Sequence, residues 1–146
     1  MTPFALNTLA VLFTSGSAFC CAAHAHAIDA QFDCHARPHA FIGALIDNND
    51  IEPNPMHVEA NSVNAFRPAH GSDMTAFGFH VYAVLGYEPG DALFRKGGGQ
   101  ALANPLYGAV LSAPSDAVKL RVSAAGSNAT VRMVVPLLLT AVVCSP

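Results

Sequence analysis

The four cysteines fall into two groups, and the second group most constrains the fold. Cys20 and Cys21 lie in an uncharged leader, whereas Cys34 and Cys144 lie near opposite ends of the remaining chain. An even pair of cysteines in an oxidising compartment is best explained as a disulfide. Closing a loop of about 110 residues would stabilise a fold by up to roughly 4–5 kcal/mol in the chain-entropy model. Since a reactive thiol pair would prefer C-x-x-C spacing, we predict a structural Cys34–Cys144 disulfide.

The leader, residues 1–27, has the pattern of a secretory signal peptide. It contains no Asp, Glu, Lys or Arg, it is mostly apolar, and it ends in small residues. Two overlapping A-x-A patterns leave cleavage after Ala25 or after Ala27 open. The first residues depart from the pattern because they include no Lys or Arg. We expect a signal peptide over 1–27 and a single periplasmic or secreted domain over 28–146, with no stable membrane anchor once the signal is cleaved.

The stretch from Cys20 to His39 holds three cysteines and four histidines, which suggests a metal site. Cleavage after Ala27 would remove two of these cysteines and two of these histidines. Pro38 then separates His35 from His39, and a helix would begin at Pro38 rather than run through it. The two imidazoles would therefore not share a helical face. We expect no metal and no cofactor here.

Composition excludes several function classes. An apolar content of 52% indicates a folded domain. The net charge is only −3 and the basic residues are scattered, so we expect no nucleic-acid partner. Neither a G-x-S-x-G elbow nor an H-E-x-x-H motif is present. In the segment 95–99 the lysine precedes the glycines, which excludes a phosphate-binding loop and indicates a surface loop.

Hydrophobic periodicity predicts an α+β fold. Strands are expected at 56–66, 75–87 and 106–111, followed by a β-rich segment over 130–143 that Pro136 interrupts. A helix is expected over 113–125, with Ser112 as its N-cap, Gly126 as its stop, and Val118, Leu120, Val122 and Ala125 on its buried side. Residues 38–46 fit either a helix or a buried strand. These elements predict a small, mainly antiparallel sheet (a β-hairpin plus β-α-β) with one or two helices packed on one face and one disulfide.

One sheet face is a candidate binding surface. The apolar residues of 56–66 change phase after Ala60, and a β-bulge at 61–62 would explain this in a hairpin that pairs Val63 with Phe79 and Ala65 with Phe77. On the non-core face, with Gly78 and Gly86 leaving open space, this register gathers Glu59, Asn61, His80 and Tyr82. Cross-strand neighbours lie within about 5–8 Å, so we predict a shallow ligand-binding surface. The alternative is a sheet with an ordinary solvated face.

Three functions follow from these features. The first is an exported non-enzymatic domain that binds a protein or small ligand through the bulged sheet face. The second is a small periplasmic hydrolase-like enzyme that uses His70 or His80, and it requires a pocket that brings one of them beside a carboxylate. The third is a structural or surface-assembly component, for which an exposed apolar run over 134–143 would be the mark. The chain is similar to small exported proteobacterial proteins of unknown function, a resemblance that transfers no catalytic residue.

Overall fold

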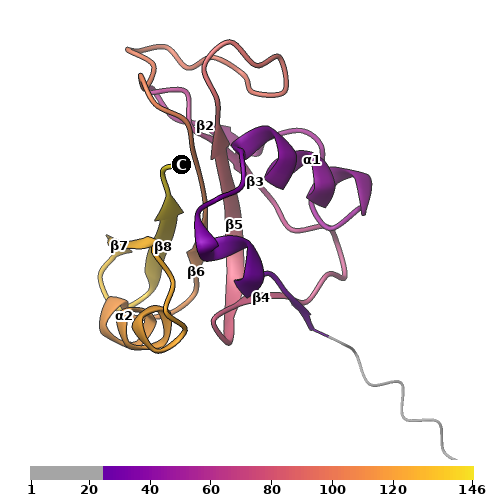
Figure 1. Cartoon of the computed structure of the whole chain (residues 1–146). Coiled ribbons are helices and arrows are strands. Elements are labelled where there is room, and N and C mark those ends of the chain that lie inside the picture. The colour runs from indigo at the N-terminus through magenta and orange to yellow at the C-terminus, as the bar shows by residue number, and fades with distance from the viewer. Residues whose placement is uncertain (1–24) are drawn as a thin grey trace, which may run out of the picture.

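The computed structural model describes residues 25–146, whose elements are labelled in Figure 1. Residues 1–24, with Cys20, Cys21 and most of the predicted signal peptide, lie outside the described residues. The helices are a short 3₁₀ segment, η1 (Asp29–Asp33), and two α-helices, α1 (Pro38–Asp47) and α2 (Ser115–Ala124). The strands are β1 (His26–Ala27), β2 (His57–Val58), β3 (Asn64–Phe66), β4 (Met74–Ala76), β5 (Phe79–Tyr87), β6 (Leu106–Leu111), β7 (Thr130–Val135) and β8 (Leu139–Cys144).

The strands form one mostly antiparallel sheet. Its main path runs β1-β4-β5-β6-β8-β7, and β2 joins it through β3. The long strand β5 is central, because β6 pairs along one of its edges while β4 and β3 pair with successive parts of the other. Among the described strands only β1 and β4 pair in parallel. The predicted α+β class with a small, mainly antiparallel sheet is confirmed.

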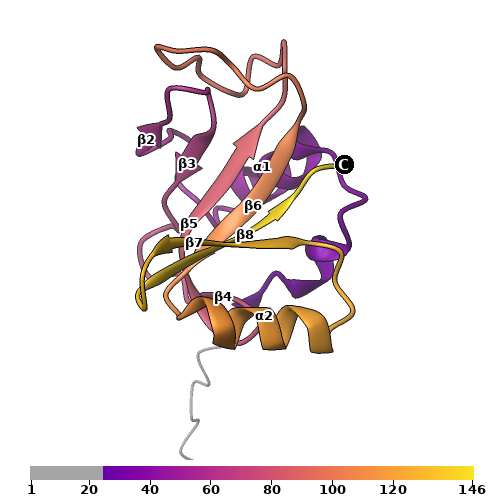
Figure 2. The same cartoon turned by 90° about the vertical axis from the view of Figure 1, so that its left-hand side faces the viewer.

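Both α-helices cover the same face of this sheet. Ile42 of α1 and Val118 of α2 are fully buried in one core cluster that also contains Val84, Tyr107 and Val142 of the strands. In Figure 2, α1 lies behind the long strands and α2 runs along their lower end. Because successive strand residues point to opposite faces, the neighbours of these core residues form a second, smaller cluster on the face that neither helix covers. That cluster consists of Ala65, Ala83, Val110 and Ala141.

The predicted disulfide is present. Cys34 and Cys144 are bonded, with their Cα atoms 5.0 Å apart and a sequence separation of 110. Cys34 directly follows η1, and the buried Cys144 ends β8 opposite Tyr107 of β6. The bond thus joins the segment before α1 to the last strand of the sheet.

The first described strand, β1, coincides with the end of the predicted signal peptide. The backbone N–H of His26 donates to the carbonyl of Asp73, and that of Ile28 donates to Thr75, both at 2.9 Å. The side chain of Ile28 is fully buried. Of the two expected cleavage sites, the one after Ala25 would therefore retain β1, and the one after Ala27 would remove it.

The segment 75–87 is a hairpin and not the single strand that its alternating pattern predicts. β4 pairs with the start of β5, and the residues Phe77 and Gly78 join the two strands. Both have positive φ, 53° and 81°, as a two-residue type I′ turn requires. The apolar series hides this turn because Phe77 is itself buried.

The segment 56–66 also folds back on itself. β2 pairs with β3, so the phase change after Ala60 marks a hairpin turn rather than the predicted bulge at 61–62. The backbone N–H of Glu59 donates to the carbonyl of Val63 at 2.8 Å and closes this turn. β3 then pairs with the end of β5, where Ala65 lies opposite Leu85. The expected pairings of Val63 with Phe79 and of Ala65 with Phe77 are therefore wrong.

The helices agree with the sequence more closely. The segment 38–46 is helical and begins at Pro38, which leaves His35 outside the helix as expected. α2 begins at Ser115 with Pro114 as its N-cap, so the predicted cap at Ser112 is wrong. Gly126 has a φ of 66° just after the helix, which confirms it as the stop.

The buried side of α2 is narrower than predicted. Val118 and Val122 are buried, but Leu120 is 71% exposed and Ala125 is also exposed. Residues two apart lie on opposite sides of a helix, so Leu120 cannot share a face with Val118. Pro136 does break the segment 130–143 as expected, and β7 and β8 form a hairpin around it.

The glycine-rich loop after β5 packs against the β2–β3 turn. The backbone N–H of Gly97 donates to Ser62 Oγ at 2.9 Å, and the buried Asn64 binds both the N–H and the carbonyl of Arg95 at 2.9 Å. A Cβ atom on Gly97 would lie 2.0 Å from the carbonyl oxygen of Glu59, so this close approach requires glycine. The loop therefore fixes the turn that carries Glu59.

Candidate functional site

The face of the sheet opposite the helices contains a hollow of about 330 Å³, which we call the apolar hollow. Its volume lies near the lower end of the range of roughly 300–1,000 Å³ that is typical of small-molecule sites. Its apolar lining consists of Met56, Ala65, Ala83, Leu85, Val110, Val134 and Leu139. Three of these residues belong to the small cluster on this face, so the hollow is built on packed side chains.

The sheet curls around this hollow. Its lining includes residues of β2, β3, β5, β6, β7 and β8, which are six strands in succession along the sheet. In a flat sheet with strands about 4.8 Å apart, the outer two would be separated by about 24 Å and could not border one small hollow. The strand twist visible in Figure 2 brings the β7–β8 hairpin toward β2 and makes this face concave.

Two β-bulges lie at the hollow. The register of β5 against β6 shifts between Val81 and Ala83, which makes Tyr82 an extra residue. The register of β7 against β8 shifts between Met133 and Val135, which makes Val134 an extra residue. Both extra residues line the apolar hollow. Bulges redirect side chains and are over-represented beside functional sites, and both of these bulges direct a side chain toward the same hollow.

The rim of the apolar hollow is polar and carries one free cation. His57 Nε2 lies 3.3 Å from Glu59 Oε1, a contact that is an ion pair when the imidazole is protonated. Arg67 is exposed, and in the described part of the chain its guanidinium forms no ion pair. Tyr82 is 52% exposed and places its hydroxyl at the same rim. The rim therefore offers a guanidinium and a phenol to a ligand.

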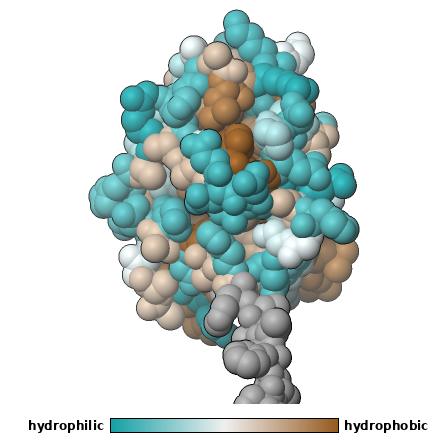
Figure 3. Space-filling model, turned by 90° about the vertical axis from the view of Figure 1, so that its right-hand side faces the viewer, coloured by the Kyte–Doolittle hydropathy of each residue, from teal (hydrophilic) through white to brown (hydrophobic). Residues whose placement is uncertain are grey.

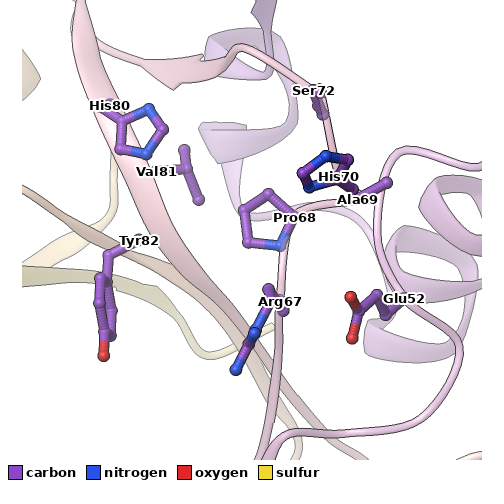
Figure 4. Close-up of a pocket in the computed structure, with 10 residues that line it drawn as sticks. Glu52, Arg67, Pro68, Ala69, His70, Ser72, His80, Val81 and Tyr82 are labelled. Atoms are coloured by element: carbon purple, nitrogen blue, oxygen red, sulfur yellow. The ribbon is translucent and has the colours of Figure 1, made fainter.

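A second hollow, the polar hollow, adjoins the first and measures about 300 Å³. Arg67 and Tyr82 line both, and the polar hollow adds Glu52, His70, Ser72 and His80. Figure 4 shows the two imidazoles on opposite walls, while the side chains of Arg67 and Tyr82 point to the same side, away from them. In the described structure no hydrogen bond joins Ser72 to His70 or His80. The polar hollow thus brings suggestive residue types together without the aligned contacts of a hydrolase triad.

The structure divides the four predicted site residues. Glu59 and Tyr82 line the apolar hollow, and His80 and Tyr82 line the polar one. Asn61 lies in the β2–β3 turn, where its side chain accepts a hydrogen bond from the N–H of Val63 at 3.2 Å. His80 lies 4.0 Å from Asp73. Asn61 lines neither hollow, and the structure does not bring the four residues together as one cluster.

The expected open space beside the two glycines is absent. Gly78 belongs to the β4–β5 turn, where it has positive φ. Gly86 faces the other side of the sheet, and a Cβ atom on it would lie 2.6 Å from Ile42 of α1. The space at the site comes instead from the alanines of the small cluster. Ala65 and Ala83 are short side chains on adjacent strands, and they leave room above the sheet.

Sequence analysis missed Arg67 and Val134 as site residues. The sequence pattern gives Arg67 no role, and it indicates Val134 only as part of the run 134–143 that would mark an assembly component. The available signal was the length of the apolar run 133–139, since one face of a short strand cannot bury that many successive side chains. Their convergence depends on the curl of the sheet, which no local pattern encodes.

Exposed apolar side chains concentrate at one hairpin. Five of the eight large exposed hydrophobic residues of the described chain lie at the end of β7 and in the following turn. They are Met133, Val134, Val135, Leu137 and Leu138. By contrast, the molecular face on the side of α1 is mostly hydrophilic with small apolar areas (Figure 3). The apolar surface is thus not spread evenly over the molecule.

Comparison with protein-family models, with curated proteins and with solved structures gave no match. Within residues 25–146, no group of three or more His, Cys, Asp or Glu side chains is arranged to hold a metal ion. Neither of the described α-helices is long and apolar enough to cross a membrane.

Proposed function

We propose that this protein is an exported, non-enzymatic binding domain that holds an apolar ligand or partner segment in the apolar hollow. The observation that carries the proposal is the pair of bulges at Tyr82 and Val134, whose side chains border one concave surface. A sheet with one face covered by helices normally leaves its other face polar. Here that face has alanine, valine and leucine at its centre and polar groups only at its rim.

An enzymatic role has weaker support. The polar hollow does place His70 and His80 in the same depression as Glu52, which is the arrangement that a hydrolase would need. However, the imidazoles lie on opposite walls, and each is exposed (Figure 4). A general base must lie within about 3 Å of the proton that it accepts, and no described nucleophile meets this condition.

Binding can be tested with N-phenyl-1-naphthylamine, an uncharged dye that fluoresces in apolar surroundings. We expect the purified protein to enhance its fluorescence in a saturable manner. Val134→Asp places a carboxylate in the hollow and should abolish the enhancement, because burying an unpaired charge is costly. Val134 is 51% exposed, so the substitution should leave the fold intact.

Leu120→Asp is the matched control. Leu120 is a large apolar residue on the opposite side of the sheet, and its 71% exposure makes it at least as accessible to the dye. Dye binding should be unchanged in this variant. Equal losses in both variants, or no saturable enhancement by the native protein, would contradict a binding role for the apolar hollow.

A second candidate function is assembly through the β7–β8 hairpin, and the cluster of exposed apolar residues there favours it. β7 is an outer strand of the sheet, and its side chains from Arg132 to Val135 are all exposed. Unprotected outer strands pair readily with another chain. Sedimentation velocity should then show a concentration-dependent dimer that Leu138→Ser weakens and Leu120→Ser does not. A monomer at all concentrations would remove this candidate.

A further inference from the structure

We infer that the ligand of the apolar hollow is a single-chain anionic amphiphile, such as a fatty acid, whose carboxylate binds Arg67. This inference rests on the proposed binding function and specifies its ligand. The apolar floor of the hollow would contact the hydrocarbon chain of such a ligand, and the charged rim would contact its head group. Arg67 and Tyr82 line both hollows, and their position between an apolar and a polar surface is what indicates an amphiphilic ligand.

The charged groups on the rim differ in the contacts that they already make. Glu59 Oε1 lies 3.3 Å from His57 Nε2, while Arg67 has no carboxylate within ion-pair distance in the described structure. A guanidinium presents paired N–H donors that match a carboxylate. The hydroxyl of Tyr82, across the same rim, can donate a further hydrogen bond to the bound anion. The rim therefore complements a carboxylate, whereas the floor complements a hydrocarbon chain.

Position and size favour one chain rather than a lipid bilayer. Arg67 and Tyr82 line both hollows, so a carboxylate bound to them would lie at the boundary between apolar and polar surfaces. A hollow of about 330 Å³ has room for part of one alkyl chain. A membrane surface would require a cluster of basic residues, and the chain carries a net charge of −3.

The test is displacement of N-phenyl-1-naphthylamine by two ligands that differ only in their head group. Dodecanoate, kept below its micelle concentration, should displace the dye at about tenfold lower concentration than dodecan-1-ol, since it adds a charge-assisted contact with Arg67. Arg67→Gln should remove this preference, so that the acid and the alcohol displace the dye at similar concentrations in that variant. Arg67→Lys should restore part of it, because lysine keeps the charge but loses the paired donors.

Arg121→Gln is the control for a general loss of positive charge. Arg121 belongs to α2 and lies over the ring of Phe79 at 5.9 Å from its centroid, away from both hollows. The preference for dodecanoate should persist in this variant. Equal displacement by the acid and the alcohol in the native protein would overturn the inference while leaving the binding function standing.

Vesicles separate a free ligand from a lipid surface. The native protein should stay in the supernatant when phosphatidylglycerol vesicles are pelleted. Co-sedimentation that dodecanoate does not compete, and that Arg67→Gln abolishes, would replace the free amphiphile with a membrane surface and overturn the inference. Absence of dye binding by the native protein would instead contradict the proposed function itself.

Discussion

At the scale of single residues, Asn64 is a central polar contact of the fold. Its side-chain amide is fully buried, donates to the carbonyls of Ser62 and Arg95, and accepts from the N–H of Arg95, each at 2.9 Å. Asn64→Ala would leave these backbone groups without partners. We expect it to lower the free energy of unfolding by about 2–3 kcal/mol. Urea denaturation measures this loss.

Asn54→Ala provides the control, since Asn54 also contacts Arg95. That contact joins two exposed side chains at 2.8 Å, so its loss should cost less than about 0.5 kcal/mol. Similar losses for both variants would show that Asn64 does not anchor the loop.

Tyr107 makes the free energy of unfolding depend on pH in the alkaline range. Burial raises the pKa of Tyr107 above its ordinary value of 10.0, and it outweighs the opposing effect of the backbone N–H of Ala36. The protonated hydroxyl donates to the carbonyl of Gln31 at 2.6 Å. Since the pKa in the folded state exceeds that in the unfolded state, the contribution is complete below about pH 10 and is lost as pH rises through the folded-state pKa.

We therefore expect the unfolding free energy to fall above about pH 10, and Tyr107→Phe to weaken this dependence. At neutral pH the substitution should cost about 1 kcal/mol, because it removes one hydrogen bond. Urea denaturation at a series of pH values gives both quantities. Tyr82→Phe, at an exposed position, should leave the alkaline decline as it is. If the native protein and both variants declined identically, the alkaline decline would have to come from titratable groups other than Tyr107.

At the scale of elements, the β7–β8 turn places a leucine in an unfavourable conformation. Leu137 has a φ of 64° and is 80% exposed, whereas glycine or asparagine usually occupies such a position. Leu137→Gly should raise the free energy of unfolding by about 0.5–1 kcal/mol, because strain is removed and little burial is lost. At the neighbouring Leu138, whose φ is not positive, the substitution Leu138→Gly should instead lower the free energy of unfolding. Thermal unfolding followed by circular dichroism compares the two. A loss of stability in both would show that the turn is not strained.

How far the sequence predicts an element depends on whether its signal is local. Pro38 and Gly126 fix helix ends through their own backbone geometry. The stop at Gly126 is predicted outright, whereas the pattern indicates Pro38 as a start only if the segment 38–46 is helical, which it leaves open. The turn at Phe77 was missed because a buried aromatic residue stands where a polar turn residue is usual. The register of β3 depends on competition between β4 and β3 for the same edge of β5. The apolar pattern of two segments considered as a pair does not indicate a third strand at that edge. The sequence pattern therefore indicates Glu59 and Tyr82, which line the apolar hollow, but it omits Arg67 and includes Asn61, which lies outside both hollows.

At the scale of the whole molecule, the Cys34–Cys144 bond joins the first part of the domain to its last strand. Replacing both cysteines with alanine should lower the free energy of unfolding by about 2–5 kcal/mol, since the unfolded chain is no longer constrained. Urea denaturation with and without dithiothreitol measures this. The native protein should lose stability on reduction, and the double variant should not respond to the reductant. Insensitivity of the native protein would show that the bond adds no stability.

The same bond makes the domain a covalent ring that encloses both α-helices and most of the sheet. A single tryptic cut at the exposed Arg95 or Lys96 would open that ring without separating its two pieces. Nicked material should therefore migrate as one species on a gel until a reductant is added, and then as two. In a protease-rich environment the chain can be severed once in this loop and still keep all of its parts attached.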